Sequence, residues 1–552
     1  MKKGILLIIA VVGLSLASIG QNNNFEIAKN IEIYTSLYKE LNENYVDEIQ
    51  PGELMQTGIE AMLESLDPYT NYIPESDVED YRFMTTGQYG GIGSLIHKQD
   101  EYVVISEPYK GFPAEEAGLK AGDKIAAING ESAKGKSTGD VSNILKGQPG
   151  TSIQLTIIRE GFEEPIVKDL ERKTIRIDNV TYYGMLDHNI GYINLNGFTQ
   201  NAWKEVRKAF TNLRSNNELE GLIIDLRGNG GGLLTEAVNV ANLFIEKDEL
   251  IVSTKGKLKD KNKTYKTRFQ PLDKDLPLAI MVNGSSASAS EILSGAAQDL
   301  DRGVVIGQRT FGKGLVQNVV PLSYNAKAKI TVAKYYIPSG RCIQAIDYSH
   351  KDENGNADKI PDSLISEFKT RNGRLVYDGG GIKPDLVLEQ QRLSNISLAL
   401  YTKFLIFDYA NKFARQHDSI PPARDFEITD EIYGDFKNFI ADKDYDYTTQ
   451  SEKTLEKLKE YSEKEKYFEA IEGEYEALEQ KMMHDKDDDL IEFRDEIEEL
   501  LKIEIVSRYY YQEGKVIASL EDDPEIRKAI EVLTDSEKYN ELLGTKDITQ
   551  KN

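Results

Sequence analysis

The spacing of apolar residues changes along the chain, and each change predicts a different kind of structure. Between residues 25 and 85 apolar side chains recur every three or four positions, beginning with Ile27, Ile31 and Tyr34. That period places side chains on one face of an α-helix. Asp67-Pro68 interrupts it, because the residue before a proline disfavours the helical conformation. We therefore expect a helical N-terminal region over residues 21–85.

Residues 86–172 contain more glycine and shorter apolar runs. A glycine-rich stretch, Gly90-Gly91-Ile92-Gly93, comes first, and apolar runs of strand length then alternate with short helical stretches. The strands are expected at 102–105, 124–128 and 153–158, and the helices at 113–119 and 141–145. This alternation predicts a small α/β module.

Residues 173–390 repeat a longer unit of strand, small-residue turn and helix. The runs 221–226 and 278–282 are apolar at nearly every position, which is typical of strands buried on both faces of a parallel sheet. Residues 391–552 hold only four glycines and many charged residues, and we expect long charged helices there, for example over 452–481 and 490–504. The chain is therefore predicted to be a multidomain α/β protein with helical regions at both ends.

The first 20 residues form an apolar segment of a different kind. Two lysines precede an apolar stretch over 5–16, and Ser18 and Gly20 supply the small residues of a cleavage site. This order is that of a secretory signal peptide, which would leave Gln21 as the mature end. An uncleaved membrane anchor is the alternative, but the stretch is shorter than the roughly 20 residues of a spanning helix. We expect an exported protein of the periplasm or cell envelope, with no membrane span after signal removal.

Composition narrows the functional classes. The 552-residue chain carries a net charge of −25, and residues 391–552 alone contribute −17. A nucleic-acid partner needs a basic surface, so this charge argues against one. Cys342 is the only cysteine, so the chain cannot form an internal disulfide and its stability must come from packing. No cluster of His and Cys has the spacing of metal ligands, and we expect neither a metal nor a cofactor.

The strongest chemical signal lies where the apolar run 278–282 meets the next helix. The segment 283–292 reads Asn-Gly-Ser-Ser-Ala-Ser-Ala-Ser-Glu-Ile and places Ser288 at the start of that helix. A helix N-terminus favours the negative oxygen that forms during acyl transfer, so Ser288 is a candidate nucleophile. Ser288 and Glu291 also fit a capping box, in which the serine would only satisfy a free helix amide. Both interpretations stay open on this segment alone.

A second segment supplies a candidate base. Lys313 stands between two glycines after the apolar run 304–307; a lysine accepts a proton only when neutral, and burial favours the neutral form. Histidine is the alternative base, but none of the five lies in a glycine-rich turn: they are His97, His188, His350, His417 and His484. Gly307-x4-Gly312-Lys313 also resembles a phosphate-binding loop, yet Gly314 stands where that loop needs Ser or Thr.

Together these motifs resemble the carboxyl-terminal processing peptidases, also called tail-specific proteases. That family carries a Ser-Ala-Ser-Ala-Ser-Glu segment and a Phe-Gly-Lys-Gly-x-Val-Gln segment, which match 286–291 and 311–317 here. Its Asp-Leu-Arg-x-Asn-x-Gly-Gly segment matches 225–232, with Gly230 where many members have proline. The likeness extends over roughly residues 30–390 and implies a PDZ domain at 86–172 followed by a peptidase core at 173–390.

The resemblance implies a role for each matching residue. Ser288 would be the nucleophile of a serine endopeptidase, Lys313 its general base, and Gln317 the residue that orients the lysine. The amide of Ala289 and that of Gly231 or Gly232 would stabilise the oxyanion.

The resemblance also implies a substrate site in the PDZ-like module. The amides of Gly90, Gly91, Ile92 and Gly93 would form a nest for a terminal carboxylate, and the substrate tail would add as a strand. A glycine turn that only leads into a strand is the alternative. The expected partners are protein substrates with accessible apolar C-termini.

The acidic region at 391–552 has no motif that assigns it a role. A solvated surface is the first interpretation, and a docking site for an activating or adaptor protein is the second. The alternative function for the whole chain is a catalytically latent PDZ scaffold that needs a partner for activation.

Overall fold

The computed structural model describes residues 24–445, 447, 450–482 and 486–545. The signal peptide expected at 1–20 lies outside these residues. The chain separates into two units. One comprises the residues before 73 together with 319–330, and the other comprises 73–318 and the chain from 331 onward.

The N-terminal region is helical, as its apolar spacing predicted. Residues 24–44 form one helix, and α2 (Pro51–Glu64) follows it. Pro51 occupies the first turn of α2, where its missing amide hydrogen leaves no helical bond unmade. None of the side chains of α2 is buried, so the apolar stripe of this region remains at the surface of its unit.

The module expected at 86–172 has its own sheet and core. Its strands are β3 (Ser94–Gln99), β4 (Tyr102–Pro108), β5 (Lys124–Ile128), β7 (Ser152–Ile158) and β8 (Ile166–Glu171), with α4 (Pro113–Glu116) and α5 (Thr138–Leu145) between them. The strands are antiparallel in the order β3-β4-β5-β7-β8. Ile105, Ile125 and Leu155 form part of a core that is separate from the cores of the rest of the chain.

A six-stranded sheet forms the centre of the next domain. Its strands are β10 (Val180–Met185), β11 (Ile190–Leu195), β12 (Gly221–Asp225), β15 (Leu278–Val282), β16 (Val304–Gly307) and β23 (Leu386–Val387). All neighbours from β11 to β23 are parallel, and β10 is antiparallel to β11. Every residue of β12 and β15 is buried, which agrees with the continuous apolar runs in the sequence.

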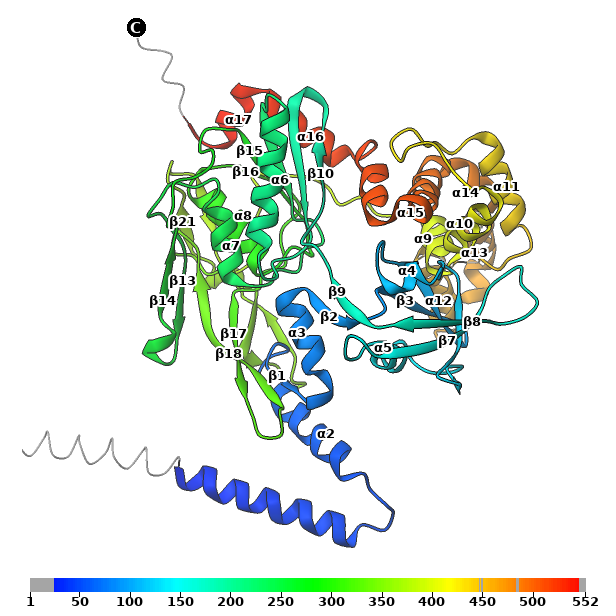
Figure 1. The fold of residues 1–552 in the computed structure, drawn as a ribbon, viewed down its shortest axis with the longest axis horizontal. Helices are drawn as coiled ribbons and strands as arrows, with labels where there is room; N and C mark the ends of the chain where they lie inside the picture. The colour runs from blue at the N-terminus through cyan, green and yellow to red at the C-terminus, as the bar shows by residue number, and fades with distance from the viewer. Residues whose placement is uncertain (1–23, 446, 448–449, 483–485, 546–552) are drawn as a thin grey trace, which may run out of the picture. The chain divides into compact units, whose positions relative to one another are not determined.

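Helices cover both faces of this sheet. Side chains alternate along a strand, so Leu222 and Ile224 of β12 face one layer and Ile223 the other. The first layer contains α6 (Ala202–Asn216), α7 (Leu234–Ala241) and α8 (Ala289–Asp299). The second contains α16 (Pro524–Thr534) and α17 (Ser536–Leu542), which come from the end of the chain and lie beside the sheet in Figure 1 (red).

This second layer corrects the interpretation of the acidic region as a solvated surface. Ile526, Ala529, Val532 and Leu533 are buried against the sheet, and the Leu278 amide of β15 donates to the Tyr539 hydroxyl at 2.9 Å. These α16 residues recur at helical spacing on one face, while the charged residues of the helix occupy the other. The net charge of the region therefore gave no indication of the apolar face of α16, which is buried against the sheet.

Most of the remaining C-terminal helices surround a core of their own. The core is formed by α9 (Asn395–Thr402), α10 (Leu405–Gln416), α11 (Asp430–Ile440), α14 (Lys486–Glu492) and α15 (Arg494–Leu520). Two further helices, α12 (Gln450–Lys464) and α13 (Phe468–Met482), contribute none of their described residues to it and pack on each other. The single helix predicted over 452–481 is wrong: the chain turns at Lys466, whose φ is 62°. The turn lets α13 pack back on α12, with Lys459 near the ring of Tyr475.

Smaller elements complete the peptidase domain. β13 (Leu250–Gly256) pairs with β14 (Lys263–Lys266) and with the end of β18 (Lys327–Tyr336). The polar stretch after residue 346 forms two hairpins. They are β19 (Ile346–Lys351) with β20 (Ala357–Lys359), and β21 (Glu367–Lys369) with β22 (Leu375–Tyr377).

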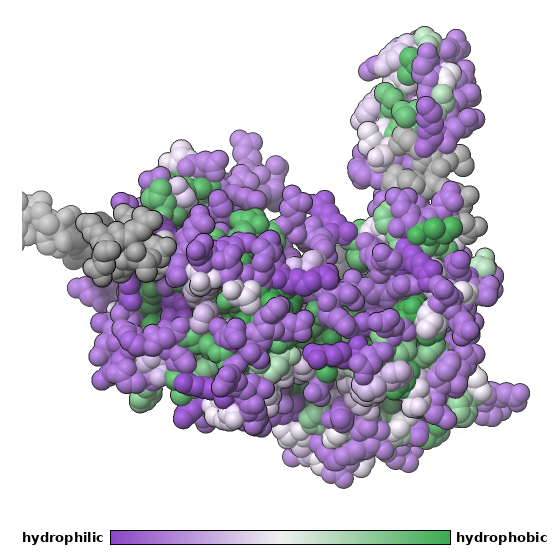
Figure 2. All heavy atoms as spheres, turned by 90° about the horizontal axis from the view of Figure 1, so that it is seen from above, coloured by the Kyte–Doolittle hydropathy of each residue, from purple (hydrophilic) through white to green (hydrophobic). Residues whose placement is uncertain are grey.

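Hydrophilic residues predominate on the face of the molecule that Figure 2 shows, and hydrophobic residues form small groups on it. Within the described residues, no helix combines the length and the apolar character needed to cross a bilayer.

Candidate active site

The three segments that carry the sequence motifs begin at the same edge of the core sheet, because each follows a strand of that sheet. β12 ends at Asp225, β15 at Val282 and β16 at Gly307, and these strands are parallel neighbours. The glycine turn (226–233), the nucleophile turn (283–288) and the lysine loop (308–314) therefore begin side by side. In open α/β sheets this carboxyl edge is where ligands bind and chemistry occurs.

Ser288 lies in a strained turn between β15 and α8. Its φ and ψ are 55° and −110°, a conformation that residues with a Cβ rarely adopt. The side chain is half-buried, and Ala289 is the first residue of α8. As a first helical residue, Ala289 has no carbonyl inside the helix for its amide to bond. The turn thus combines a serine hydroxyl with a helix-start amide, the pair that acyl transfer uses.

Glu291 connects two of the three segments. Its Oε2 accepts from the backbone amides of Ser288 and Lys313 at 2.8 and 2.9 Å. Its Oε1 accepts from the amide of Gly312 at 2.7 Å and from the hydroxyl of Thr310 at 2.6 Å. Burial of the fully enclosed carboxyl raises the pKa of Glu291 to about 7, against the lowering effect of these donors.

The capping box proposed from the sequence is present, and in it the amide of Ser288 donates to the carboxylate of Glu291 at 2.8 Å. The same carboxylate also holds the lysine loop, which the Ser288-x-x-Glu291 spacing did not indicate.

Asn229 fixes the glycine turn beside the nucleophile turn. Its carbonyl accepts from the Ala287 amide at 3.1 Å and from the Ser290 hydroxyl at 2.9 Å. Its buried side chain donates to the carbonyl of Leu195 at 2.6 Å and accepts from the amide of Gly231 at 2.8 Å. The two bonds to the carbonyl join the glycine turn to the nucleophile turn and the start of α8, and the two bonds of the side chain fix the glycine turn itself.

The two candidate oxyanion glycines differ in what they can contribute. Gly231 has φ +103°, and a Cβ there would lie 2.9 Å from the nitrogen of Ala289 and from Cβ of Ser288. Only glycine permits that approach, but its amide is already bonded to Asn229. Gly232 has no acceptor for its amide among the residues that the structure describes. Gly231 is therefore the residue that closely approaches the nucleophile turn, and Gly232 is the residue whose amide is available as a hydrogen-bond donor.

Lys313 and Gln317 lie at the start of the next strand. Lys313 is half-buried and lies two residues before the first residue of β17 (Leu315–Pro321). Gln317 is in β17, and its side-chain amide donates to the hydroxyl of Thr331 at 3.2 Å. The loop before them is tied to the nucleophile turn, because the amide of Phe311 donates to the carbonyl of Ser286 at 3.0 Å. A strand follows the lysine, whereas a helix follows the lysine of a phosphate-binding loop.

Three of the five histidines make contacts elsewhere. His97 stacks on Phe404 with ring centroids 4.4 Å apart, and His417 stacks on Phe413 at 4.0 Å. His350 pairs with Asp347 at 2.7 Å. His188 lies in a short turn before β11, and His484 lies outside the described residues. Within the described part of the chain, no three His, Cys, Asp or Glu side chains gather as a metal site.

The glycine-rich stretch of the PDZ-like module is divided between a strand and a turn. Gly90 and Gly91 belong to β2 (Gln88–Gly91), which pairs with β9 (Lys173–Arg176). Ile92 and Gly93 lie between β2 and β3, and their carbonyls accept from Ala114 and Tyr109 at 2.8 and 2.9 Å. Gly93 has φ +75°, and a Cβ there would lie 2.6 Å from Cβ of Phe112. The turn available for a carboxylate is thus shorter than the four residues expected.

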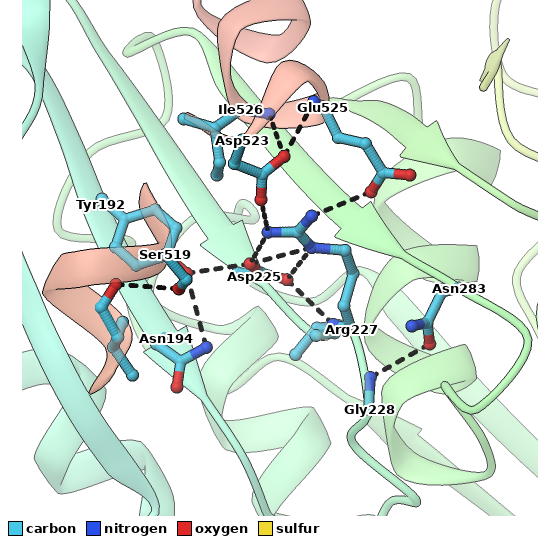
Figure 3. A network of polar contacts seen from close by, with 12 residues as sticks. Tyr192, Asn194, Asp225, Arg227, Gly228, Asn283, Ser519, Asp523, Glu525 and Ile526 are labelled. Atoms are coloured by element: carbon cyan, nitrogen blue, oxygen red, sulfur yellow. Dashed lines mark hydrogen bonds and ion pairs between the residues drawn. The ribbon is translucent and has the colours of Figure 1, made fainter. Parts of the chain in front are cut away.

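Arg227 joins the glycine turn to the end of the chain (Figure 3). Its guanidinium contacts the carboxylates of Asp225, Asp523 and Glu525 at 2.7, 2.8 and 2.9 Å. Burial lowers the pKa of Arg227, but the carboxylates of Asp225 and Asp523 outweigh it and the pKa is raised. The Asp-Leu-Arg motif gave no indication of Asp523 and Glu525, which lie about 300 residues away in sequence.

Three segments of the chain match known families. Residues 189–350 match peptidase family S41, and residues 104–159 match a PDZ domain. Residues 396–533 match a family described as probable PDZ-protease, C-terminal helical domain. The region for which the sequence offered no motif is therefore similar to a domain found with PDZ proteases.

Individual relatives are similar over much of their length. A carboxy-terminal-processing protease from Bartonella bacilliformis is 34% identical over 332 residues, which cover 60% of this chain and 76% of the relative. A probable CtpA-like serine protease from Staphylococcus epidermidis is 35% identical over 339 residues, 61% of this chain and 68% of the relative. Among solved structures, a photosystem II D1 C-terminal processing protease aligns over 64% of this chain and 92% of its own, with 27% identity and a TM-score of 0.36.

Proposed function

The chain belongs to the carboxy-terminal-processing proteases, serine-type peptidases with a PDZ domain, and from this premise we propose that it cleaves protein substrates near their C-termini by Ser–Lys catalysis. We propose Ser288 as the nucleophile, Lys313 as the general base and Gln317 as the residue that orients the base. The amides of Ala289 and Gly232 would bind the oxyanion.

One observation carries this proposal: a single buried carboxylate accepts from the amides of both Ser288 and Lys313. These two residues lie on different loops, and Glu291 supplies a rigid connection between their backbones. Catalytic groups must be held close to their productive geometry, since small displacements reduce the rate strongly. An acceptor shared by the backbone amides of the candidate nucleophile and the candidate base holds their two loops together, which supports the proposed catalysis.

The proposed reaction proceeds through an acyl-enzyme. Neutral Lys313 takes the proton of the Ser288 hydroxyl, and the serine oxygen bonds to the scissile carbonyl carbon. The carbonyl oxygen becomes an oxyanion that accepts from Ala289 and Gly232. When the peptide C–N bond breaks, Lys313 returns the proton to the leaving amine. Water then attacks the ester, Lys313 accepts its proton and returns it to Ser288, and the shortened substrate leaves as a carboxylate.

Substrate capture is proposed for the PDZ domain. The turn at Ile92 and Gly93 lies between β2 and β3 and belongs to neither strand, so its amides are candidate donors to a terminal carboxylate. β3 is the end strand of its sheet, and an extended tail can add to such a strand through backbone hydrogen bonds. An apolar C-terminus is the expected ligand. A substrate with an amidated C-terminus should therefore show a higher KM and a similar kcat.

Export is proposed from the first 20 residues and is consistent with the bacterial relatives. Fractionation of cells that express the full chain tests it. Recovery of the protein in the cytoplasm would contradict it.

The test of the catalytic proposal is cleavage of an unstructured protein with an apolar C-terminus by the chain from Gln21 onward. Ser288→Ala and Lys313→Ala should both abolish cleavage while remaining folded by circular dichroism. Near wild-type cleavage by Lys313→Ala would remove the lysine as base and return the histidines as candidates. A wild-type protein as inert as the variants would favour the latent PDZ scaffold, with a partner required for activation.

A further inference from the structure

Two acidic residues at the start of α16, Asp523 and Glu525, reach the loops of the candidate active site. We call this pair the acidic clamp. Asp523 contacts the Arg227 guanidinium at 2.8 Å, and Glu525 contacts it at 2.9 Å through Oε2. Figure 3 shows both carboxylates directed at the arginine from the C-terminal helix. Arg227 lies two residues after the end of β12 and directly before Gly228, the first glycine of the glycine turn.

The clamp also contacts the lysine loop. Oε1 of Glu525 accepts a hydrogen bond from the side-chain amide of Gln308, the residue that follows β16 and opens the loop that leads to Lys313. Each carboxylate oxygen of Glu525 thus contacts a different segment of the site: Oε2 contacts Arg227 of the glycine turn, and Oε1 accepts from Gln308 of the lysine loop. The two segments are those that flank the nucleophile turn on the sheet edge, because β12 and β16 are the two neighbours of β15.

The clamp is fixed in place by its own helix. Asp523 is the N-cap of α16, and its carboxylate accepts from the amides of Glu525 and Ile526 at 2.8 and 3.2 Å. Both acidic side chains are largely buried, with 16% and 14% of their surfaces exposed. The helix behind them is packed on the core sheet through Val532 and Leu533. Partly buried charges of this kind impose a defined geometry on the loops that they pair with.

The backbone around Arg227 transmits this constraint to the glycine turn. The amide of Arg227 donates to Asp225 at 2.9 Å, and the amide of Gly228 donates to the side chain of Asn283 at 3.0 Å. Asn283 begins the nucleophile turn. A displacement of Arg227 would therefore shift Gly228 and the turn to which the oxyanion glycines belong.

We propose that the C-terminal extension acts as a positioning element of the active site, in which Asp523 and Glu525 hold Arg227 and Gln308 and so set the relative placement of the oxyanion amides and Lys313. This inference rests on the proposed Ser–Lys function and adds to it a contribution from residues outside the peptidase domain. Asp523 and Glu525 are positioning residues, since they act through other groups. Without them the PDZ domain would still capture substrate, but the captured peptide would be cleaved slowly.

The test compares Glu525→Gln with Glu531→Gln in the full-length protein. Glu525→Gln keeps the side-chain volume but removes the charge and places an amide donor against Gln308 or Arg227. Glu531→Gln removes the same charge from the same helix at an exposed position, where Glu531 pairs with Lys528 and Lys538. We expect Glu525→Gln to lower kcat about tenfold or more with KM changed less than about twofold. Glu531→Gln should match the wild type in both.

A second measurement separates positioning from general stability. Amide hydrogen exchange should increase in 226–233 and 308–314 of Glu525→Gln, relative to Glu531→Gln, with no change in the PDZ domain. A double-mutant cycle with Arg227→Gln should show that the two losses in kcat are not additive.

Equal kcat and equal exchange in Glu525→Gln and Glu531→Gln would overturn the inference. Failure of the proposed function is distinguishable from this result, since it appears as wild-type cleavage that persists in Ser288→Ala. In that case the hydrogen-exchange comparison still decides whether the clamp orders the two loops.

Discussion

Ser288 and Lys313 share one hydrogen-bond acceptor, since their backbone amides donate to the same oxygen of Glu291 at 2.8 and 2.9 Å. The two residues lie 25 positions apart on loops that follow different strands. Their backbones are joined by the third residue of the helix that Ser288 begins. The local geometry of that helix thus determines where the lysine loop can lie.

The titration of Glu291 should be visible in the stability of the protein. Its pKa is raised from 4.5 to about 7 in the native state, so over this interval the folded protein binds a proton that the unfolded chain has lost. The stability linked to this proton is complete below pH about 4.5 and is lost as the pH rises through about 7. In Glu291→Gln, the decrease in unfolding free energy between about pH 5 and about pH 8 should be smaller by about 2–3 kcal/mol.

Urea denaturation at the two pH values measures this difference. Glu531→Gln is the control, because its carboxyl has a pKa lowered to about 2 by Lys528 and Lys538 and does not titrate in the interval. An unchanged pH dependence in Glu291→Gln would contradict the assignment. The variant should also be less stable at every pH, because a glutamine has one acceptor oxygen for the four donors around it.

The backbone conformation of Ser288 predicts an unusual order of stability. With φ 55° and ψ −110°, a residue with a Cβ is strained by about 1–3 kcal/mol, and glycine is not. Glycine is also a better helix N-cap than alanine. Ser288→Gly should therefore unfold at a higher urea concentration than Ser288→Ala, although both lack the nucleophile and cleave nothing. If alanine is the more stable replacement, the turn is not strained.

Gly231 and Gly230 provide a matched pair in the glycine turn. A Cβ at Gly231 would lie 2.6 Å from the carbonyl oxygen of Ala287, and backbone atoms cannot move aside as a side chain can. A Cβ at Gly230 has no atom within 4 Å. Gly231→Ala should displace the turn that carries the Gly232 amide and so reduce kcat/KM by at least about 100-fold, the scale of losing an oxyanion donor. Gly230→Ala should remain within about twofold of the wild type, as steady-state kinetics with a peptide substrate can determine. Equal effects would refute the close approach of Gly231 to the nucleophile turn.

The C-terminal helices should contribute to the stability of the peptidase domain. Leu533 is buried against the core sheet, so Leu533→Ala should lower the unfolding free energy by about 2–4 kcal/mol through lost burial and a cavity. Leu458→Ala, at a largely exposed position on α12, should change it by less than about 0.5 kcal/mol. Thermal denaturation followed by the intrinsic fluorescence of Trp203 on α6 reports on the peptidase domain. A Leu533→Ala transition identical to that of the wild type would show that α16 is not part of its core.

The apolar periodicity and the short motifs by themselves determined the order of the domains and the family. Continuous apolar runs identified β12 and β15 because strands of a parallel sheet are buried on both faces. The residue types at 225–232, 286–291 and 311–317 indicated a serine peptidase because each motif contains its chemistry within a few residues. Local signals of this kind need no knowledge of distant contacts.

Only the tertiary structure decided which distant segments form hydrogen bonds and ion pairs with one another. The four donors to Glu291, the bond between Asn229 and Gly231, and the clamp on Arg227 depend on which strands become neighbours. Pairings between loops leave no periodic trace in a sequence. The acidic end of the chain was expected to be solvated because charge dominates its composition. Its apolar residues are spaced to form one helical face, and the sheet needed a second covering layer, so burial of that face determined where α16 and α17 lie.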